Sequence, residues 1–146
     1  LHTNTAVGAV TRLRDMGVEP FLLSSSLIGV VAQRLVRVLD PATRVPYTAS
    51  EYECNLLRAD SNNPPTLYHA AEARSGTAQG YHGRTGIYEL VTIDDELRRM
   101  IHDGAGEHEL EAYARQHSPS IRREGLQKAE QGVTTLEEVL RVTRAD

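Results

Sequence analysis

The chain has 146 residues, 40% of them hydrophobic, and its 20 acidic and 16 basic residues give a net charge of −4. This apolar content excludes a disordered chain and is enough for one folded domain or two small ones. The two signs of charge are well mixed, so the sequence shows no basic face that would bind nucleic acid.

The first two predicted elements are helices. Apolar residues recur three and four positions apart at Ala6, Val10, Leu13 and Met16, behind a Thr/Asn cluster that can cap a helix. Gly17 stands where this amphipathic helix would stop. Pro20 suits the first position of a second helix, and the apolar residues of 21–31 cover nearly its whole circumference. We therefore expect the second helix to be buried on most sides.

The same apolar stretch, FLLSSSLIGVVA, is about half as long as a membrane span requires and is followed by Gln33 and Arg34. It therefore predicts a buried helix rather than a transmembrane one. The hydroxyls of its serines, residues 24–26, are expected to bond back to the preceding turn rather than act as nucleophiles.

A strand is predicted for RLVRVL, and a long irregular insertion follows from Pro41 to Gly83. Ser50 and Glu53 have the spacing of a capping box, which predicts one short helix inside the insertion. From residue 71 to Gly83 the chain is mostly Gly, Ala, Ser and Thr, with almost nothing to bury. An insertion of this length needs a restraint or a function.

A strand over residues 87–91 is followed by a chain that reads as helical to its end. The predicted helices have apolar faces and stop at Gly104, near Ser118 and at Gly132. The last begins at Thr135, whose spacing to Glu138 again fits a capping box. Residues 93–146 are therefore predicted to form a small helical bundle.

Several common kinds of site are excluded by spacing. His108 and Glu109 begin a metalloprotease motif, but Ala112 stands at its second histidine position. The glycines at 80, 83 and 86 precede a strand, whereas a phosphate loop must lead into a helix. Because the sequence has no Gly-Lys-Ser/Thr, any phosphate cradle is expected outside it. Cys54 and the six histidines have no metal-ligand spacing, and no secretory leader is found, so we expect a cytoplasmic protein.

Four segments carry a resemblance to a known family: LHTNTA, RLRDMGVEPFLLSSSLIGVVAQRLVRVL, GYHGRTGIYEL and GVTTLEEVLRVTR. Together they resemble the C-terminal part of the type II secretion traffic ATPases, the family of general secretion pathway protein E. The resemblance implies an α/β fragment of a RecA-like P-loop ATPase domain. Residues 1–39 would be the edge of its core, 40–83 an irregular inserted subdomain, 84–92 a return strand and 93–146 a C-terminal helical bundle.

The resemblance also implies that the insertion lacks the metal-binding cysteines of the family. In the family it is usually a metal-binding subdomain with two Cys-x-x-Cys pairs, whose positions here hold Asp40, Thr43, Ala73 and Gly76. Since Ala and Gly supply no side-chain donor, we predict that structural zinc is absent. The insertion must then be held by packing of apolar and aromatic residues, namely Tyr47, Leu56, Leu57, Leu67, Tyr68 and Tyr81, or stay mobile. Of these alternatives we expect the looser subdomain.

Three site residues follow from the resemblance. His2 looks like the family's His box, a histidine near the nucleotide phosphates, although a histidine there could simply cap the backbone. Arg34 would fix a helix-to-strand junction near the nucleotide or pair with a carboxylate. Arg84 would approach phosphates, within a subunit or across to the next, or lock a turn between Gly83 and Gly86.

The implied function is that of a hexameric Mg-ATPase that drives pseudopilus assembly and protein export. The phosphate-binding loop, the acidic Mg boxes and the domain that docks to the inner-membrane platform would lie upstream of Leu1. ATP and Mg would therefore bind mainly outside this chain, which alone is predicted to be inactive. We expect a homo-hexamer, peripheral at the cytoplasmic face of the bacterial inner membrane and held there through partners only. A type IV pilus assembly ATPase and a non-catalytic protein-interaction module remain alternatives.

Overall fold

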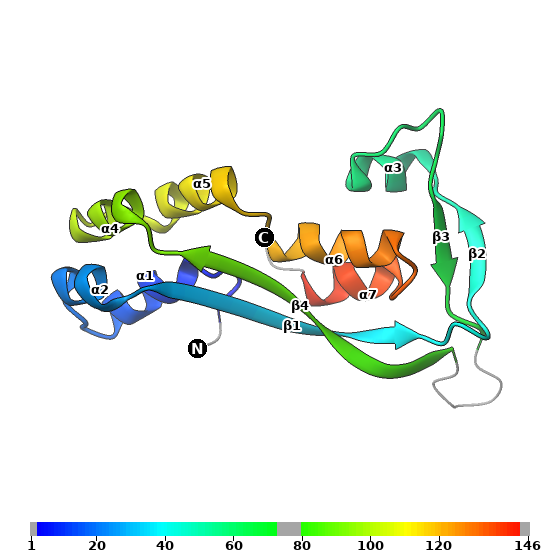
Figure 1. The fold of residues 1–146 in the computed structure, drawn as a ribbon, viewed down its shortest axis with the longest axis horizontal. Coiled ribbons are helices and arrows are strands. Elements are labelled where there is room, and N and C mark those ends of the chain that lie inside the picture. Colours follow the sequence, from blue (N-terminus) through cyan, green and yellow to red (C-terminus); the bar gives the residue numbers. More distant parts are fainter. Residues whose placement is uncertain (1–2, 73–79, 144–146) are drawn as a thin grey trace. The chain divides into compact units, whose positions relative to one another are not determined.

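The computed structural model describes residues 3–72 and 80–143. Along the chain (Figure 1) the elements are α1 (Gly8–Asp15), α2 (Pro20–Ser26), β1 (Gly29–Leu39), β2 (Val45–Thr48), α3 (Glu51–Leu57), β3 (Thr66–His69), β4 (Tyr81–Thr92), α4 (Asp95–His102), α5 (Glu107–His117), α6 (Ile121–Glu130) and α7 (Leu136–Val142). Contacts divide the described residues into two compact parts. Unit 1 comprises 3–33 and 88–121, and unit 2 comprises 34–72, 80–87 and 122–143.

The strands form two pairs. β1 pairs with β4, and the boundary between the units falls within both strands. β2 pairs antiparallel with β3, with Tyr47 opposite Leu67, inside unit 2. The described residues thus form an α/β chain, as predicted. None of the helices within 3–72 and 80–143 is both long and apolar enough to cross a membrane.

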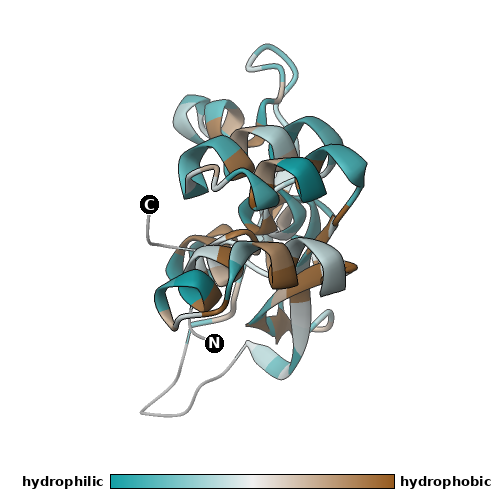
Figure 2. Cartoon of the chain, turned by 90° about the vertical axis from the view of Figure 1, so that its left-hand side faces the viewer, coloured by the Kyte–Doolittle hydropathy of each residue, from teal (hydrophilic) through white to brown (hydrophobic). Residues whose placement is uncertain are grey.

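Local signals placed most helix ends correctly. Pro20 is the first residue of α2, and glycines with left-handed backbone angles follow α1, α4 and α6: Gly17, Gly104 and Gly132. Ser50 and Glu53 form the full capping box of α3, each side chain bonded to the other's backbone N–H. In Figure 2 the helices carry both hydrophilic and hydrophobic residues, as amphipathic helices do.

The prediction for residues 21–31 was wrong in two respects. The helix ends at Ser26, and β1 begins at Gly29, because the backbone is already extended at Leu27 (φ −72°, ψ 131°). Ile28, Val30 and Val31 around the start of β1 are β-branched and favour a strand. Phe21 is also 55% exposed, so α2 is not buried on most sides. The predicted bonding of serine hydroxyls to the preceding turn is confirmed for Ser24 and Ser25, which donate to the carbonyls of Phe21 and Leu22 at 3.0 and 3.3 Å.

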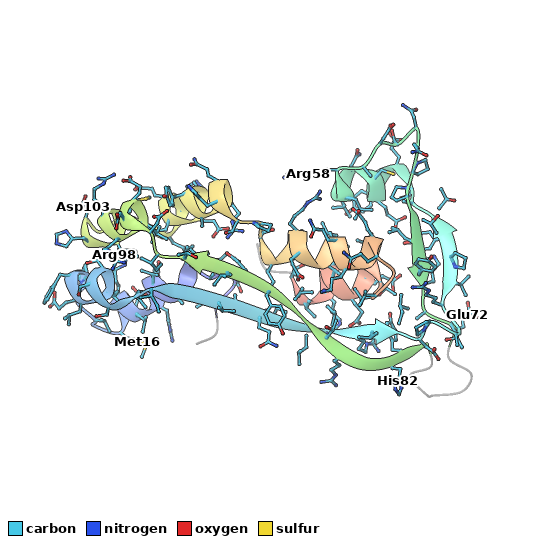
Figure 3. All side chains as sticks on the ribbon, in the orientation of Figure 1. Met16, Arg58, Glu72, His82, Arg98 and Asp103 are labelled. Carbon is cyan, nitrogen blue, oxygen red and sulfur yellow. The ribbon has the colours of Figure 1, made fainter. Side chains whose placement is uncertain are left out.

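Unit 1 is built around one apolar core. Its buried members are Ala6, Val7, Val10, Leu23, Val91, Ile93, Leu97, Ile101, Leu110 and Ala114. They come from the two residues before α1, from all four helices of the unit, and from β4 with the residue after it. Arg98, labelled on α4 in Figure 3, adds polar contacts by donating to the carbonyls of Ser24 and Ile93. α2 and α4 are thereby joined by both apolar and polar contacts.

A buried ion pair fixes α5 to β4 in unit 1. The Glu89 side chain on β4 is 1% exposed and accepts a hydrogen bond from Arg115 on α5. Arg115 also contacts Glu111, one turn earlier on α5, at 2.8 Å. Leaving a carboxylate this deeply buried without a partner would strongly destabilise the fold. The ion pair with Arg115 therefore fixes the position of α5 on β4.

Unit 2 holds the described part of the insertion against α6 and α7. A second apolar core joins Ala49, Cys54, Leu57 and Leu67 of the insertion to Leu126, Ala129, Leu136 and Val139 of the two helices. Arg123 on α6 donates to the Leu57 carbonyl at 2.9 Å. These residues therefore have the apolar packing that the sequence offered as the alternative to a looser subdomain. Tyr47 and Leu56 are partly buried against the same core.

Arg44 forms a further link between the insertion and α6. Its guanidinium donates to the Gly132 carbonyl at 2.8 Å and lies over the Tyr68 ring, 4.0 Å from the centroid. Gly132 leaves room for both groups, since a Cβ there would lie 2.4 Å from Arg44 Nη1 and 2.9 Å from Tyr68 Cε2. A side chain at position 132 would push Arg44 out of its place.

The four helices predicted after residue 93 are all present. α4 and α5 belong to unit 1, whereas α6 and α7 belong to unit 2. The grouping of residues 93–146 into one subdomain remains a prediction.

Replacing Arg115 by Met should leave the Glu89 carboxylate buried without its partner and lower the free energy of unfolding by about 3–5 kcal/mol. The double variant Glu89→Leu/Arg115→Met should recover much of this loss, because no buried charge remains. Urea unfolding at neutral pH measures both. Arg99→Met is a matched control, since Arg99 pairs with Glu96 on the surface, where solvent screens the ion pair and its loss should change the stability little. If Arg115→Met and Arg99→Met lowered the free energy of unfolding equally, the buried ion pair would stabilise the protein no more than the surface pair does.

Candidate functional site

Part of the predicted site lies outside the described residues. His2, Ala73 and Gly76 fall there. The residues that follow His2 are described and lead into α1. Thr5 Oγ1 accepts a hydrogen bond from the N–H of Gly8, the first residue of α1, at 3.1 Å, although the N-cap itself is Val7, which makes no side-chain cap.

The start of α1 borders an open hollow of about 490 Å³ in unit 1, lined by Thr5, Glu107, His108 and Glu111. Thr5 Oγ1 donates to Glu107 Oε1 at 3.4 Å, a long hydrogen bond. The hollow carries two carboxylates. Negative charge on its wall opposes phosphate, so the hollow by itself is not a phosphate-binding site.

Arg34 and Arg84 both lie within strands. Arg34 is half-buried inside β1, so it is not at the helix-to-strand junction that the sequence suggested. Arg84 lies in β4, which runs without interruption from Tyr81 to Thr92, so the expected turn between Gly83 and Gly86 does not exist. Its side chain is exposed. The part of the chain that the structure describes contains no ion pair of Arg84, which leaves its charge available to an outside group. A role for either arginine at a nucleotide stays a prediction.

The residues at the family's metal positions do not fit a zinc ion. Asp40 Oδ1 accepts a hydrogen bond from the Ala42 N–H at 2.9 Å, which closes a turn at the start of the insertion. Ala and Gly at two of the other positions have no donor atom. Cys54, the only cysteine, is buried in the apolar core of unit 2. Residues 3–72 and 80–143 hold no group of three or more His, Cys, Asp or Glu side chains suited to a metal.

The strongest charge cluster in the described chain surrounds Glu138 of α7, which is 2% exposed. Arg37 of β1 donates to it three times, from the backbone N–H at 2.9 Å, from Nε at 3.0 Å and from Nη2 at 2.7 Å. Arg141 adds two contacts at 3.2 and 2.9 Å. The Arg37 guanidinium also lies over the Tyr81 ring, 4.3 Å from its centroid, and Thr134 Oγ1 donates to the Arg37 carbonyl.

Protonation of Glu138 is strongly disfavoured. Burial raises the pKa of its carboxyl, but the hydrogen bonds from Arg141 and Arg37 outweigh burial and lower it to about 2. An acid or base catalyst needs a pKa closer to neutral pH and an open path to a substrate. Glu138 therefore has a structural role, because its ion pair with Arg37 joins α7 to β1.

Sequence reasoning missed the ion pairs of Arg37 with Glu138 and of Glu89 with Arg115. Two weak signals were available, since Arg37 interrupts a predicted strand and Glu89 follows the apolar Ile87 and Tyr88 in another. A charge inside a strand indicates a buried partner but does not say where that partner lies in the sequence.

A comparison with known families matches residues 1–141 to the model of the Type II/IV secretion system protein. The chain belongs to this family. It is 58% identical over all of its 146 residues to type II secretion system protein E of Pseudomonas aeruginosa. Over 99% of its length it is 55% identical to type II secretion system ATPase E of Vibrio cholerae. It spans about 29% of the length of either relative. The resemblance carried by the four quoted segments is thereby confirmed.

The acid stability of the protein should depend on Glu138. Its folded-state pKa lies below the ordinary value of 4.5, so its stabilisation is complete above that pH and is lost as the pH falls toward 2. Glu138→Gln should lower the free energy of unfolding at pH 7 by about 3 kcal/mol and flatten its fall between pH 5 and about 2. Urea unfolding at a series of pH values gives both quantities.

The control is Glu130→Gln on α6, whose side chain is exposed. It should leave the pH profile of the parent unchanged, because a solvated carboxylate is replaced. A Glu138→Gln protein with the acid profile of the parent would contradict the role assigned to this network.

Proposed function

We propose that this chain is the C-terminal part of a type II secretion ATPase, an enzyme that couples ATP hydrolysis to pseudopilus assembly and protein export. The observation that carries the proposal is the 58% identity to type II secretion system protein E over the whole chain. The relative from Vibrio cholerae is named an ATPase. These names favour secretion over type IV pilus assembly.

The α/β character of the described residues supports a RecA-like fragment. In this proposal residues 1–39 form the edge of the ATPase core, 40–83 the inserted subdomain and 84–92 the return strand. Residues 93–146 form the C-terminal helical subdomain. The apolar packing of Ala49, Cys54, Leu57 and Leu67 on α6 and α7 supports an inserted subdomain held by apolar contacts.

ATP and Mg²⁺ would bind mainly to the part of the enzyme outside this chain, because the sequence has no Gly-Lys-Ser/Thr phosphate loop. Bound Mg²⁺ would neutralise charge on the β- and γ-phosphates. His2 would sense the γ-phosphate, and Arg84 would supply a guanidinium to the phosphates. The exposure of Arg84, and the absence of an ion pair for it among the described residues, support that role.

The whole enzyme would be a homo-hexamer that acts on platform proteins of the inner membrane, at the cytoplasmic face, with no nucleic-acid partner. Nucleotide-dependent movement would pass to the platform through a two-state element biased by contacts to the γ-phosphate. Structural zinc would play no part in the insertion.

ATP hydrolysis tests the proposal. The purified 146-residue chain should show no Mg-dependent turnover, whereas a chimera that joins it to the rest of the Pseudomonas aeruginosa relative should hydrolyse ATP. In the chimera His2→Ala should lower kcat by roughly tenfold or more, as expected for loss of one contact to the developing charge. The Kd for ATP should change little. A coupled phosphate-release assay and nucleotide titration measure these quantities.

His82→Ala is the matched control, because His82 is an exposed histidine on β4, labelled in Figure 3. Its kcat should equal that of the parent chimera. Turnover by the isolated chain, or a folded hexameric chimera without turnover, would contradict the proposal. An equal kcat for His2→Ala and His82→Ala would remove His2 from the site.

A further inference from the structure

A pocket of about 260 Å³ opens in unit 2 between α3, the β2–β3 pair and α7. Its wall includes Tyr47, Tyr52, Glu53, His69, Glu137 and Leu140. Figure 1 shows α3 beside β3, both in the insertion. This pocket takes no part in the proposed ATPase chemistry.

One wall of the pocket is aromatic. The rings of Tyr47 and His69 are stacked, with centroids 3.8 Å apart and planes 8° from parallel. Tyr52 on α3 lies at the rim and is 68% exposed. The face of a tyrosine ring carries the negative side of its quadrupole, which attracts cations.

The pocket is also negatively charged. Glu53 accepts hydrogen bonds from the Tyr47 hydroxyl at 2.6 Å and from the Ser50 N–H at 3.0 Å. Burial raises the pKa of Glu53, but these hydrogen bonds outweigh burial and lower it, so the carboxylate is ionised at neutral pH. Both donors are neutral, and the charge of nearby His69 also lowers the pKa of Glu53. Glu137 on α7 adds a second, exposed carboxylate.

Within the described chain, neither carboxylate forms an ion pair with Lys or Arg, and neither residue type lines the pocket. In unit 2, guanidinium groups do occupy tyrosine faces, including that of Tyr68, which also lines the pocket. Arg37 lies over Tyr81 and Arg44 over Tyr68, with distances of 4.3 and 4.0 Å to the ring centroids. The pocket thus has the aromatic face and the carboxylates of such a contact but no lysine or arginine in its lining.

We propose that this pocket binds an arginine side chain presented by a protein partner. A guanidinium is planar, stacks on aromatic rings and donates in a fork that matches carboxylates, whereas an ammonium is a point charge that does not stack. A volume of about 260 Å³ holds one long side chain and is below the usual size of a cofactor site. The partner would therefore be a protein segment with an exposed arginine, anchored on the insertion.

The test uses the whole 146-residue chain and three acetylated, amidated tripeptides, Gly-Arg-Gly, Gly-citrulline-Gly and Gly-Lys-Gly. Titration by NMR should shift the resonances of Tyr47, Tyr52 and His69 with the arginine peptide at millimolar concentration. The citrulline peptide has nearly the same shape without the charge and should cause no shift there. The lysine peptide should bind more weakly.

Two variants assign the binding to this pocket. Tyr52→Ala and Glu137→Gln change exposed side chains. Each should raise the Kd for the arginine peptide about two- to fivefold, as expected for loss of one exposed cation–π or ion-pair contact. Glu130→Gln removes the same charge from α6, outside the pocket, and should leave the Kd unchanged. Equal shifts with arginine and citrulline would overturn the proposal, as would unchanged binding by both pocket variants. Equal affinity for lysine would overturn the specificity for a guanidinium. None of these outcomes depends on ATP hydrolysis.

Discussion

Burial of the Glu138 carboxylate is the constraint on which unit 2 depends. Arg37 of β1 and Arg141, one turn further along α7, both pair with it, because an unpaired charge at that depth is strongly destabilising. The pair with Arg37 fixes α7 against β1. α7 then presents Leu136 and Val139 to the insertion, so the apolar core of unit 2 follows from the position of the charge network.

This order of dependence explains how an insertion without the family's four cysteines can be held. A structural zinc site stabilises a small subdomain through metal–ligand bonds. Here Cys54, Leu57 and Leu67 are each about 1% exposed and pack on α6 and α7. Arg44 adds a hydrogen bond to the Gly132 carbonyl and a cation–π contact with Tyr68. The restraint is therefore apolar packing on neighbouring helices.

The sequence predicted those features that local chemistry determines. Pro20 marked the start of α2, and Ser50 with Glu53 marked that of α3, because caps and fixed backbone angles act over a few residues. The Thr135–Glu138 capping box shows the limit. Thr135 Oγ1 does accept from the Glu138 N–H, at 3.1 Å, but the Glu138 side chain bonds to Arg37, about 100 positions away, and not to Thr135. The ion pair with Arg37 thus took the place of the second capping-box hydrogen bond that the local spacing predicted.

The same limit applies to the site residues. Motifs pointed to His2 and Arg84, because their neighbours in the sequence carry the family's pattern. Spacing gave no indication of the Glu89–Arg115 pair or of the pocket beside Glu53, since their members come from elements far apart in the chain. The length of the second helix was misjudged for a related reason. Apolar residues on all sides fit a buried helix and a strand equally well until the rest of the fold is known.

Hydrogen exchange of residues 45–69 in protein treated with a chelator tests most directly whether packing alone holds the insertion. If it does, the amides of β2, α3 and β3 will stay protected without metal, with protection comparable to that of α6. Exchange of these amides at the rate of an unstructured chain, while α6 stays protected, would contradict the account and show that the insertion needs another restraint.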